Sequence, residues 1–454
     1  MTVCSAFRPF RLAGLGALSA ALVTGALPAH AVRCVDENPA ETAPAADLPA
    51  PTRGPDAASR DALRALVERA VARSQAVGAA RLLAEAAANE VDEAKAGALP
   101  RADLTGGVIA IGTSGQDITS SRGTQARAGV NVVASLYDAG RVAELTGWRR
   151  GLAEAARLGE IGTQEEIGLQ TVSLALERGR YSVQARVYRQ YAEKLSCLVD
   201  ALEQIVRADR GRASELVQAQ KNRQQVELSQ EQTASALRQV ETKLRRFVGD
   251  PLPETGDLAA ALLELPPLAT LQAEAERAVE IVQLDAQIDA SASYARAVVA
   301  GQKPQVSWVV SGNRSAGVGG SNSVSAGLNV NIPLYSPADI YTASAARLRT
   351  DAARRQRADA LEARRFRMAD VHEQAAAAFD RARRVVDVVR ISNEVRNSTL
   401  LQWQQLGRRS LFDVMAAEGD YYSLRLAHVN ALYDGEQSAA LLRSLGLGLA
   451  AWLQ

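Results

Sequence analysis

The sequence predicts a membrane protein of mixed all-α plus β class, in which a few β-strands contribute to a barrel and long α-helices extend it. Three observations predict this fold class. Two stretches of about 70 residues have an uninterrupted helical pattern. Segments before each stretch alternate strictly between apolar and polar residues, as strands with two unlike faces do. The same motifs recur in the same order in both halves of the chain, which indicates an internal repeat.

The N-terminus has the features of a secretory signal peptide over residues 1–31. A basic stretch with Arg8 and Arg11 precedes an apolar run at 12–27, and the sequence AHA then fits the small-x-small cleavage rule. Residues 32–60 follow as a leader rich in proline and alanine. No later segment has the ~20 apolar residues of a transmembrane helix, so we expect any membrane crossing to use β-strands.

Composition excludes several function classes. Lys and Arg total 52 against 51 Asp and Glu, a net charge of +1, so we expect no nucleic-acid partner. We find no catalytic constellation, cofactor motif or metal-ligand spacing, and we expect no enzyme, cofactor or metal site. His372 and His428 are interpreted as helix-surface residues. Cys34 and Cys197 could form a disulfide in an oxidising compartment or remain two thiols.

Four pairs of motifs define the repeat, each pair about 200 residues apart. Ala-Gly-x-x-Pro begins at Ala96 and Ala300, and Gly-Arg-x-Ser begins at Gly211 and Gly407. The first repeat spans residues 61–249, a proline-rich linker covers 250–266, and the second repeat spans 267–449. Each half is expected to run helix, β-hairpin, very long helix, turn, helix.

The predicted hairpins cover residues 101–137 and 305–335. One face of each second strand is apolar and is predicted to face lipid, while Ser, Asn and Gly occupy much of the other face. The predicted lipid-facing residues are Val130 and Val132 in the first hairpin, and Val324, Ala326, Leu328, Val330, Ile332 and Leu334 in the second. The alternative is a half-buried sheet in a soluble domain, but the signal peptide and the repeat favour the membrane.

The strands are long enough to cross an outer membrane. Twelve residues at ~3.4 Å each reach ~40 Å, and a tilt of ~45° leaves ~28 Å, close to the apolar band of a bacterial barrel. Four strands cannot close a barrel, and an open edge in lipid would leave backbone groups unpaired. We therefore expect oligomerisation, with three copies giving a 12-stranded barrel that holds a water channel.

Two very long helices are predicted, at about 139–208 and 338–406. In the first, apolar residues at intervals of seven, from Ile167 to Leu202, predict a left-handed coiled coil. A helix of about 70 residues extends ~105 Å. A soluble coiled coil is the alternative, but direct fusion to membrane-type hairpins favours an α-helical barrel that continues the β-barrel.

Together these features resemble the TolC family of outer-membrane exit ducts, over about residues 61–446. The resemblance is carried by the two Ala-Gly-x-x-Pro motifs, the strand end NVNIPLYS at 329–336, and LGRRSLFDVMAAE at 406–418. It implies a homotrimer in the outer membrane of a Gram-negative bacterium, with a periplasmic extension. It implies, as partners, outer-membrane lipid, a periplasmic adaptor (membrane fusion protein) and an inner-membrane pump of ABC or other type.

The resemblance also implies a periplasmic gate. The family closes this end with inward carboxylates on the helix after the second Gly-x-x-[Ser/Thr] turn, and Asp413 matches the first of them. Arg409 matches a basic residue that ties neighbouring helices together. The chain departs from the pattern at Ala416, where a second carboxylate is usual, and at Gln404, where an aromatic residue is usual.

For the substrate, the resemblance leaves two branches. One is type I protein secretion, for example of a toxin of the adenylate cyclase type, and the other is efflux of small molecules or drugs. Arg33 stands before Cys34 where lipidation needs a small residue, and many drug-efflux relatives are lipidated there, so we favour toxin export. A soluble periplasmic coiled-coil adaptor or structural protein is the alternative from another class.

Overall fold

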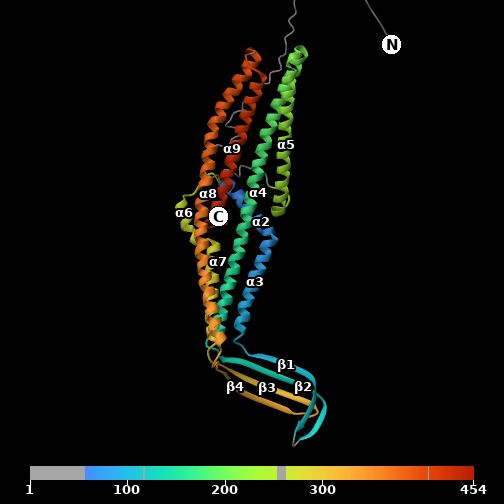
Figure 1. The fold of residues 1–454 in the computed structure, drawn as a ribbon, viewed down its shortest axis with the longest axis vertical. Coiled ribbons are helices and arrows are strands. Elements are labelled where there is room, and N and C mark those ends of the chain that lie inside the picture. The colour runs from blue at the N-terminus through green and yellow to red at the C-terminus, as the bar shows by residue number, and fades with distance from the viewer. Residues whose placement is uncertain (1–56, 116–117, 253–261, 407, 454) are drawn as a thin grey trace, which may run out of the picture.

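The computed structural model describes residues 57–115, 118–252, 262–406 and 408–453. The molecule is elongated, with helices along the long axis and a sheet at one end (Figure 1). The turns that join the long helices to their partners lie at the opposite end and are called the helical tips. The predicted signal peptide and nearly all of the predicted leader lie outside the described residues.

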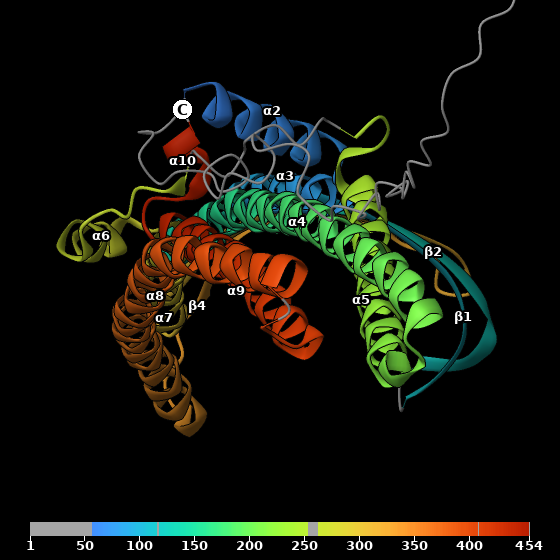
Figure 2. The same cartoon turned by 90° about the horizontal axis from the view of Figure 1, so that it is seen from above.

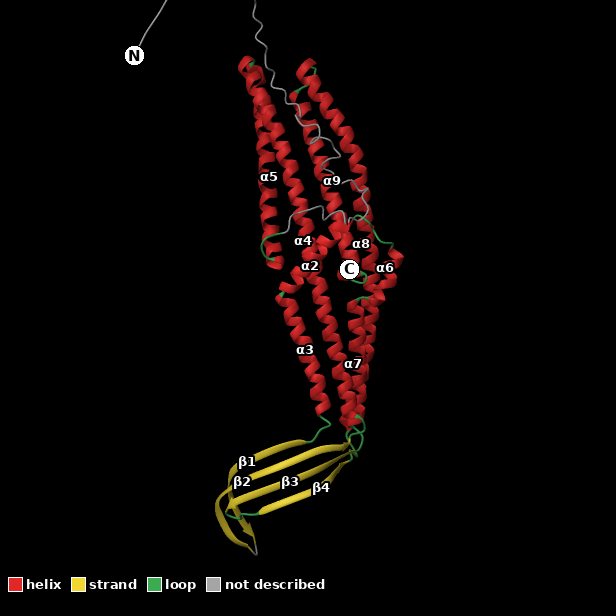
Figure 3. Ribbon diagram, turned by 180° about the vertical axis from the view of Figure 1, so that it is seen from behind, coloured by secondary structure: helices red, strands yellow, loops and turns green. Residues whose placement is uncertain are grey.

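The sheet has four antiparallel strands in the order β1-β2-β3-β4. The strands are β1 (Arg101–Gly115), β2 (Ile118–Tyr137), β3 (Gln305–Gly317) and β4 (Asn322–Asn331). Both predicted hairpins are therefore confirmed, and β2 pairs with β3 to join the two halves of the chain. β1 and β4 each have one neighbour among the described strands. Figure 3 shows the β1–β2 hairpin bending at the end far from the helices.

The last strand is shorter than predicted. β4 ends at Asn331, so Ile332 and Leu334 lie beyond the ladder rather than in it. Pro333 explains the difference, because proline has no N–H to donate to a neighbouring strand. Ile332 and Leu334 are nevertheless 54% and 92% exposed, so this apolar stretch lies open between the sheet and the next helix.

Both very long helices are confirmed, with 68 residues in α4 and 70 in α8. The helices are α2 (Ala57–Arg73), α3 (Gln75–Ala96), α4 (Arg141–Ala208), α5 (Ala213–Val248), α6 (Leu268–Glu274), α7 (Val279–Gly301), α8 (Pro337–Leu406), α9 (Leu411–Leu445) and α10 (Leu449–Leu453), with 3-10 turns at Arg210–Arg212 and Ala275–Arg277. None of these described helices is long and apolar enough to cross a bilayer.

The long helices form one curved row. In the tip half the order of neighbours is α8-α9-α4-α5, and in the sheet half it is α8-α7-α4-α3. Seen along the axis, the row follows an arc with α8 near one edge and α5 near the other (Figure 2). The small helices α2 and α10 lie on the convex side of this arc.

Local signals explain where the helices begin. Asp138 accepts hydrogen bonds from the N–H groups of Gly140 (3.0 Å) and Val142 (2.7 Å), which satisfies donors at the start of α4. Ser74 accepts from the N–H of Val77 and starts α3, so the helical segment before β1 is broken in two. Apolar clusters hold the helices together at two heights. One cluster, around Leu176 and Leu432, lies at mid-height, and another, around Leu195 and Leu411, lies near the tips.

Candidate functional site: a two-faced sheet and the helical tips

The pairing register brings the predicted lipid-facing residues of β2 and β4 to one face of the sheet. Side chains of directly paired residues in antiparallel strands point to the same side. Val132 pairs with Val310, and Val310 pairs with Ala326. Val130 pairs with Leu104 of β1. The same face also carries Val108, Val306, Trp308, Val324, Leu328 and Val330 by this register.

This apolar face is open. Val324 is 86% exposed, Leu104 79% and Leu328 70%. Water-exposed apolar surface of this extent is unusual in a protein that works alone in water and marks a membrane or partner contact. The predicted residues Val130 and Val330 are also exposed. The alternation in the sequence therefore corresponds to one apolar face of the sheet, on which several large side chains are exposed.

The opposite face of the sheet is mainly polar and contains many small residues. Asn131 pairs with Ser311, which in turn pairs with Ser325, and the two serine hydroxyl oxygens lie 2.7 Å apart. The other polar residues of this face include Asp103, Thr105, Gln125, Arg127, Ser307, Asn313 and Asn329. A few apolar side chains, such as Val309, interrupt the pattern. The sheet therefore has one apolar face and one mainly polar face.

At the α8–α9 tip, Asp413 forms a capping box with Ser410. The Ser410 hydroxyl accepts a hydrogen bond from the N–H of Asp413 at 3.2 Å, and Asp413 Oδ2 accepts from the N–H of Ser410 at 3.1 Å. This arrangement satisfies orphan donors at the start of α9. The Asp413 carboxylate is therefore held at the tip by its role in starting the helix.

Arg409 lies beside this cap but does not contact Asp413 in the described contacts. Its Nε donates to Oε1 of Gln402, in the last turn of α8, at 3.2 Å. Arg409 is exposed. The two predicted gate residues are thus both at the tip, four residues apart, with one holding the helix start and the other holding the helix end.

A cluster of buried charges and rings lies just below this tip, and none of its residues was predicted from the sequence. Glu418 of α9 is fully buried, 3.6 Å from Arg396 of α8 and 3.9 Å from Lys194 of α4. Arg396 also lies over the ring of Tyr421, with Cζ 4.3 Å from its centroid. Because removing one partner of a buried pair strands the other charge, this cluster fixes how three helices meet.

Two stacked tyrosines extend the cluster. The rings of Tyr191 and Tyr422 lie 4.5 Å apart at 17°. Burial, and then the charges of Glu418 and Asp420, raise the pKa of Tyr191 to about 12, so this phenol stays neutral. The sequence signals this cluster only by charged residues that stand among apolar ones in the helices. Charged residues are also common on solvent-exposed helix faces, so this signal does not indicate burial.

His428 corrects a prediction. It was interpreted as a surface residue, but it is 1% exposed, and Nδ1 lies 3.0 Å from the carbonyl oxygen of Ala382. Burial lowers the pKa of His428, and the hydrogen bond to Ala382 only partly offsets this. The error arose because α9 is buried on more than one side, so that no apolar stripe marks its inward face.

The cysteine prediction is tested in part. Cys197, near the tip cluster on α4, is disulfide-bonded, but its partner and Cys34 lie outside the described residues. The pairing of Cys34 with Cys197 therefore stays a prediction. Among the described residues no group of His, Cys, Asp and Glu could hold a metal ion.

Comparisons with known proteins find matches among solved structures. No protein-family model and no curated protein matches the chain. Among solved structures, the chain is similar to CusC, with a TM-score of 0.76 and 14% identity, covering 85% of this chain and 92% of that one.

Two further solved structures are similar over the same part of the chain. The outer-membrane protein VceC from Vibrio cholerae gives a TM-score of 0.72 at 18% identity, covering 85% of this chain and 96% of that one. The open-state MtrE outer-membrane channel of Neisseria gonorrhoeae gives 0.71 at 16%, covering 85% and 89%. At these identities the likeness shows the fold.

Proposed function

We propose that this chain, which has the fold of TolC-type outer-membrane channels, is the outer-membrane exit duct of a tripartite export system. The shared fold confirms the resemblance seen in the sequence. The observation that carries the proposal is the sheet, which has one apolar and open face and one polar face. The apolar face would contact outer-membrane lipid and the polar face would line a water-filled passage.

A homotrimer with a 12-stranded barrel follows from the edges of this sheet. β1 and β4 would present unpaired backbone groups to lipid, and pairing β1 of one copy with β4 of the next removes both edges. Three copies of four strands give a barrel wide enough for a passage. The same order of elements in the two halves, helix to hairpin to long helix to helix, supports the internal repeat.

The helical row supports the same assembly. Both of its edges carry exposed apolar side chains, and a head-to-tail contact between two different edges closes a ring when the rotation fits. On α8 these residues are Ile340, Tyr341, Leu348, Phe366, Val388, Ile391 and Val395, and on α3 and α5 they are Leu82, Leu83, Val217 and Leu228. Three arcs would then form an α-helical barrel that continues the passage through the periplasm.

The partners would act at the helical tips. An inner-membrane pump and a periplasmic adaptor would deliver substrate there, and Asp413 and Arg409 would form the gate. By symmetry, three Asp413 carboxylates would face one another around the axis, attracting cations and slowing their passage. No chemistry is proposed for the chain itself, so its function is transport.

We propose type I protein secretion as the task, with small-molecule efflux as the other branch. The support is a single sequence feature, Arg33 before Cys34, which disfavours lipidation. Deleting the gene and measuring both secreted protein and drug susceptibility separates the branches. Loss of a secreted polypeptide with unchanged susceptibility is expected, and the reverse result would assign the chain to efflux.

Electron microscopy of the detergent-extracted protein tests the duct itself. A three-fold hollow cylinder with a detergent belt at one end and a long stalk is expected. The protein should also be found in the outer-membrane fraction. A soluble rod without a belt would contradict the proposal and favour the periplasmic adaptor.

A further inference from the structure

The polar face of the sheet contains a cavity of about 490 Å³ beside the β3–β4 turn, which lies at the end of the sheet away from the helices (Figure 1). It is lined from three strands and the β3–β4 turn. The polar side chains that line it are those of Thr105, Gln125, Arg127, Asn313, Ser315 and Ser321. Arg314 also borders the cavity, but the register turns its side chain toward the other face, and the rest of the lining is glycine and alanine. Hydroxyls, amides and guanidinium groups donate hydrogen bonds, and no carboxylate is among the lining residues.

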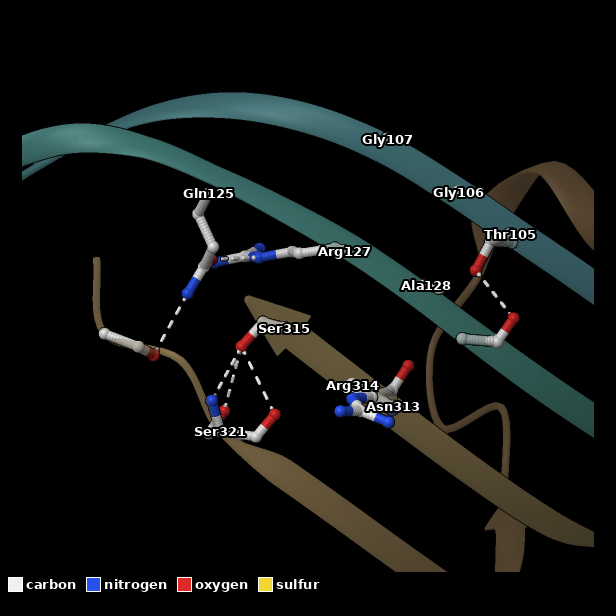
Figure 4. Close-up of a pocket in the computed structure, with 12 residues that line it drawn as sticks. Thr105, Gly106, Gly107, Gln125, Arg127, Ala128, Asn313, Arg314, Ser315 and Ser321 are labelled. Carbon is white, nitrogen blue, oxygen red and sulfur yellow. Dashed lines mark hydrogen bonds between the residues drawn. The ribbon is translucent and has the colours of Figure 1, made fainter. Parts of the chain in front are cut away.

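Gln125 organises the cavity. It is 4% exposed, and its Nε2 donates to the carbonyl oxygens of Val318 (3.1 Å) and Gly319 (3.0 Å) in the β3–β4 turn. This turn is therefore held against the polar face. The turn is closed by Ser315 and Ser321, whose backbone and hydroxyl groups hydrogen-bond each other (Figure 4).

The same glutamine orients Arg127. With both amide hydrogens facing the turn, its Oε1 accepts a hydrogen bond from Nε of Arg127 at 2.6 Å (Figure 4). A guanidinium held through Nε keeps its two terminal nitrogens, which form the fork that binds oxyanions in a bidentate way. The small neighbours of Arg127 in the register, Gly107 and Ser315, leave space around this fork.

Arg127 also differs from the other charged residues of this face, because no carboxylate among the described residues pairs with it. On the polar face of the described strand residues, the other charged side chains are Arg101 and Asp103, and these pair with each other at 3.0 Å. Arg127 has no carboxylate partner among the described residues. A fixed guanidinium, surrounded by donors and without a counter-charge from those residues, favours an anionic ligand.

We propose that this cavity is an oxyanion-binding site, with Arg127 as the main ligand and with hydroxyl and amide donors around it. The ligand class is a phosphate or carboxylate group, carried by a free ion or by exported cargo. The site itself lies within one chain. Only its place in a passage rests on the proposed function, under which three copies would form a ring of positive charge near the exit.

Calorimetric titration of the full-length, detergent-solubilised protein with inorganic tripolyphosphate, and separately with citrate, tests the site. Tripolyphosphate or citrate should bind the unchanged protein, and Arg127→Gln should weaken binding at least tenfold. Arg122→Gln is the matched control, because Arg122 lies on the same strand with its side chain toward the other face, and it should bind normally. Arg127→Lys should bind with intermediate affinity, since it keeps the charge and loses the fork.

Two results would overturn the proposal: no binding of either anion to the unchanged protein, or equal binding by Arg127→Gln with the sheet intact by circular dichroism. Single-channel recording separates this from the duct itself. Reversible block of current by tripolyphosphate, lost in Arg127→Gln, is expected. A protein that binds the anion but forms no pore would retain the site and disprove the passage.

Discussion

Gly151 of α4 lies directly against Ala290 of α7. A Cβ at position 151 would come within 2.8 Å of the Ala290 Cβ and 2.9 Å of its Cα and N atoms. Contact with backbone atoms cannot be relieved by turning a side chain. This is therefore a point where two helices approach as closely as their backbones allow, in the half of the row nearest the sheet.

Gly151→Ala should destabilise the protein because the added methyl group separates α4 from α7. We expect a loss of about 1–3 kcal/mol, as for overpacking elsewhere. Gly162→Ala on the same helix is the control, since nothing lies within 4 Å of a Cβ there. It should be neutral or gain up to ~1 kcal/mol from helix propensity. Thermal unfolding by circular dichroism measures both, and equal melting temperatures would contradict the close contact.

Arginine substitutions distinguish the two faces of β4. Leu328 pairs with Trp308 on the apolar face, whereas Asn329 pairs with Ser307 on the polar face. Leu328→Arg should reduce assembly, because an arginine facing lipid costs about 2–4 kcal/mol at mid-bilayer. Asn329→Arg should assemble normally. The yield of folded oligomer in the outer membrane is the measurement, and similar yields from the two variants would refute the face assignment.

The two roles of Asp413, helix cap and gate charge, can be tested separately. Asp413→Gln removes the charge but keeps a residue suited to the capping box, so cation selectivity should fall. Ser410→Ala removes the cap at a cost of about 1 kcal/mol but keeps the charge, so selectivity should stay. The reversal potential in a planar bilayer reports selectivity. An unchanged potential in Asp413→Gln would exclude the carboxylate from the passage.

His428 should make stability depend on pH. Its pKa in the folded protein lies below the ordinary value of 6.5, so the unfolded chain binds the proton more readily. Stability should be constant above the unfolded pKa and fall as pH decreases below it, until the folded pKa is reached. Melting temperatures measured from pH 8 to 5.5 should show this loss. His428→Gln should reduce it and His372→Gln should not, whereas identical pH profiles would contradict the assignment.

The long helices and strands could be predicted because their signals are strictly periodic. Leu195 and Leu202 continue a seven-residue spacing and both are fully buried in α4. Val130 and Leu328 continue a two-residue spacing, and the register places them on one face. Periodicity did not predict the end of β4, which depends on one residue, Pro333, within a continuing apolar pattern.

The tip cluster and the anion cavity could not be predicted, because both depend on contacts between distant parts of the chain. Glu418 lies far in sequence from Lys194, and nothing in the sequence around either residue indicates that they are in contact. Gln125 was interpreted only as part of a polar face. Its burial depends on the turn at Val318, which lies in the other half of the chain. A polar residue buried by a loop leaves no local trace in the sequence.

Helix α4 changes its neighbouring helices along its length, so the tip half of the molecule can be redesigned separately from the sheet half. Near the tips α4 packs on α5 and α9, and near the sheet it packs on α3 and α7. The length of the tip half is thus independent of the helices that join the sheet. Inserting one heptad into each of α4, α5, α8 and α9 above this exchange would lengthen the stalk by ~10 Å and keep the same faces in contact. Under the proposed function, the longer stalk would suit a wider periplasm.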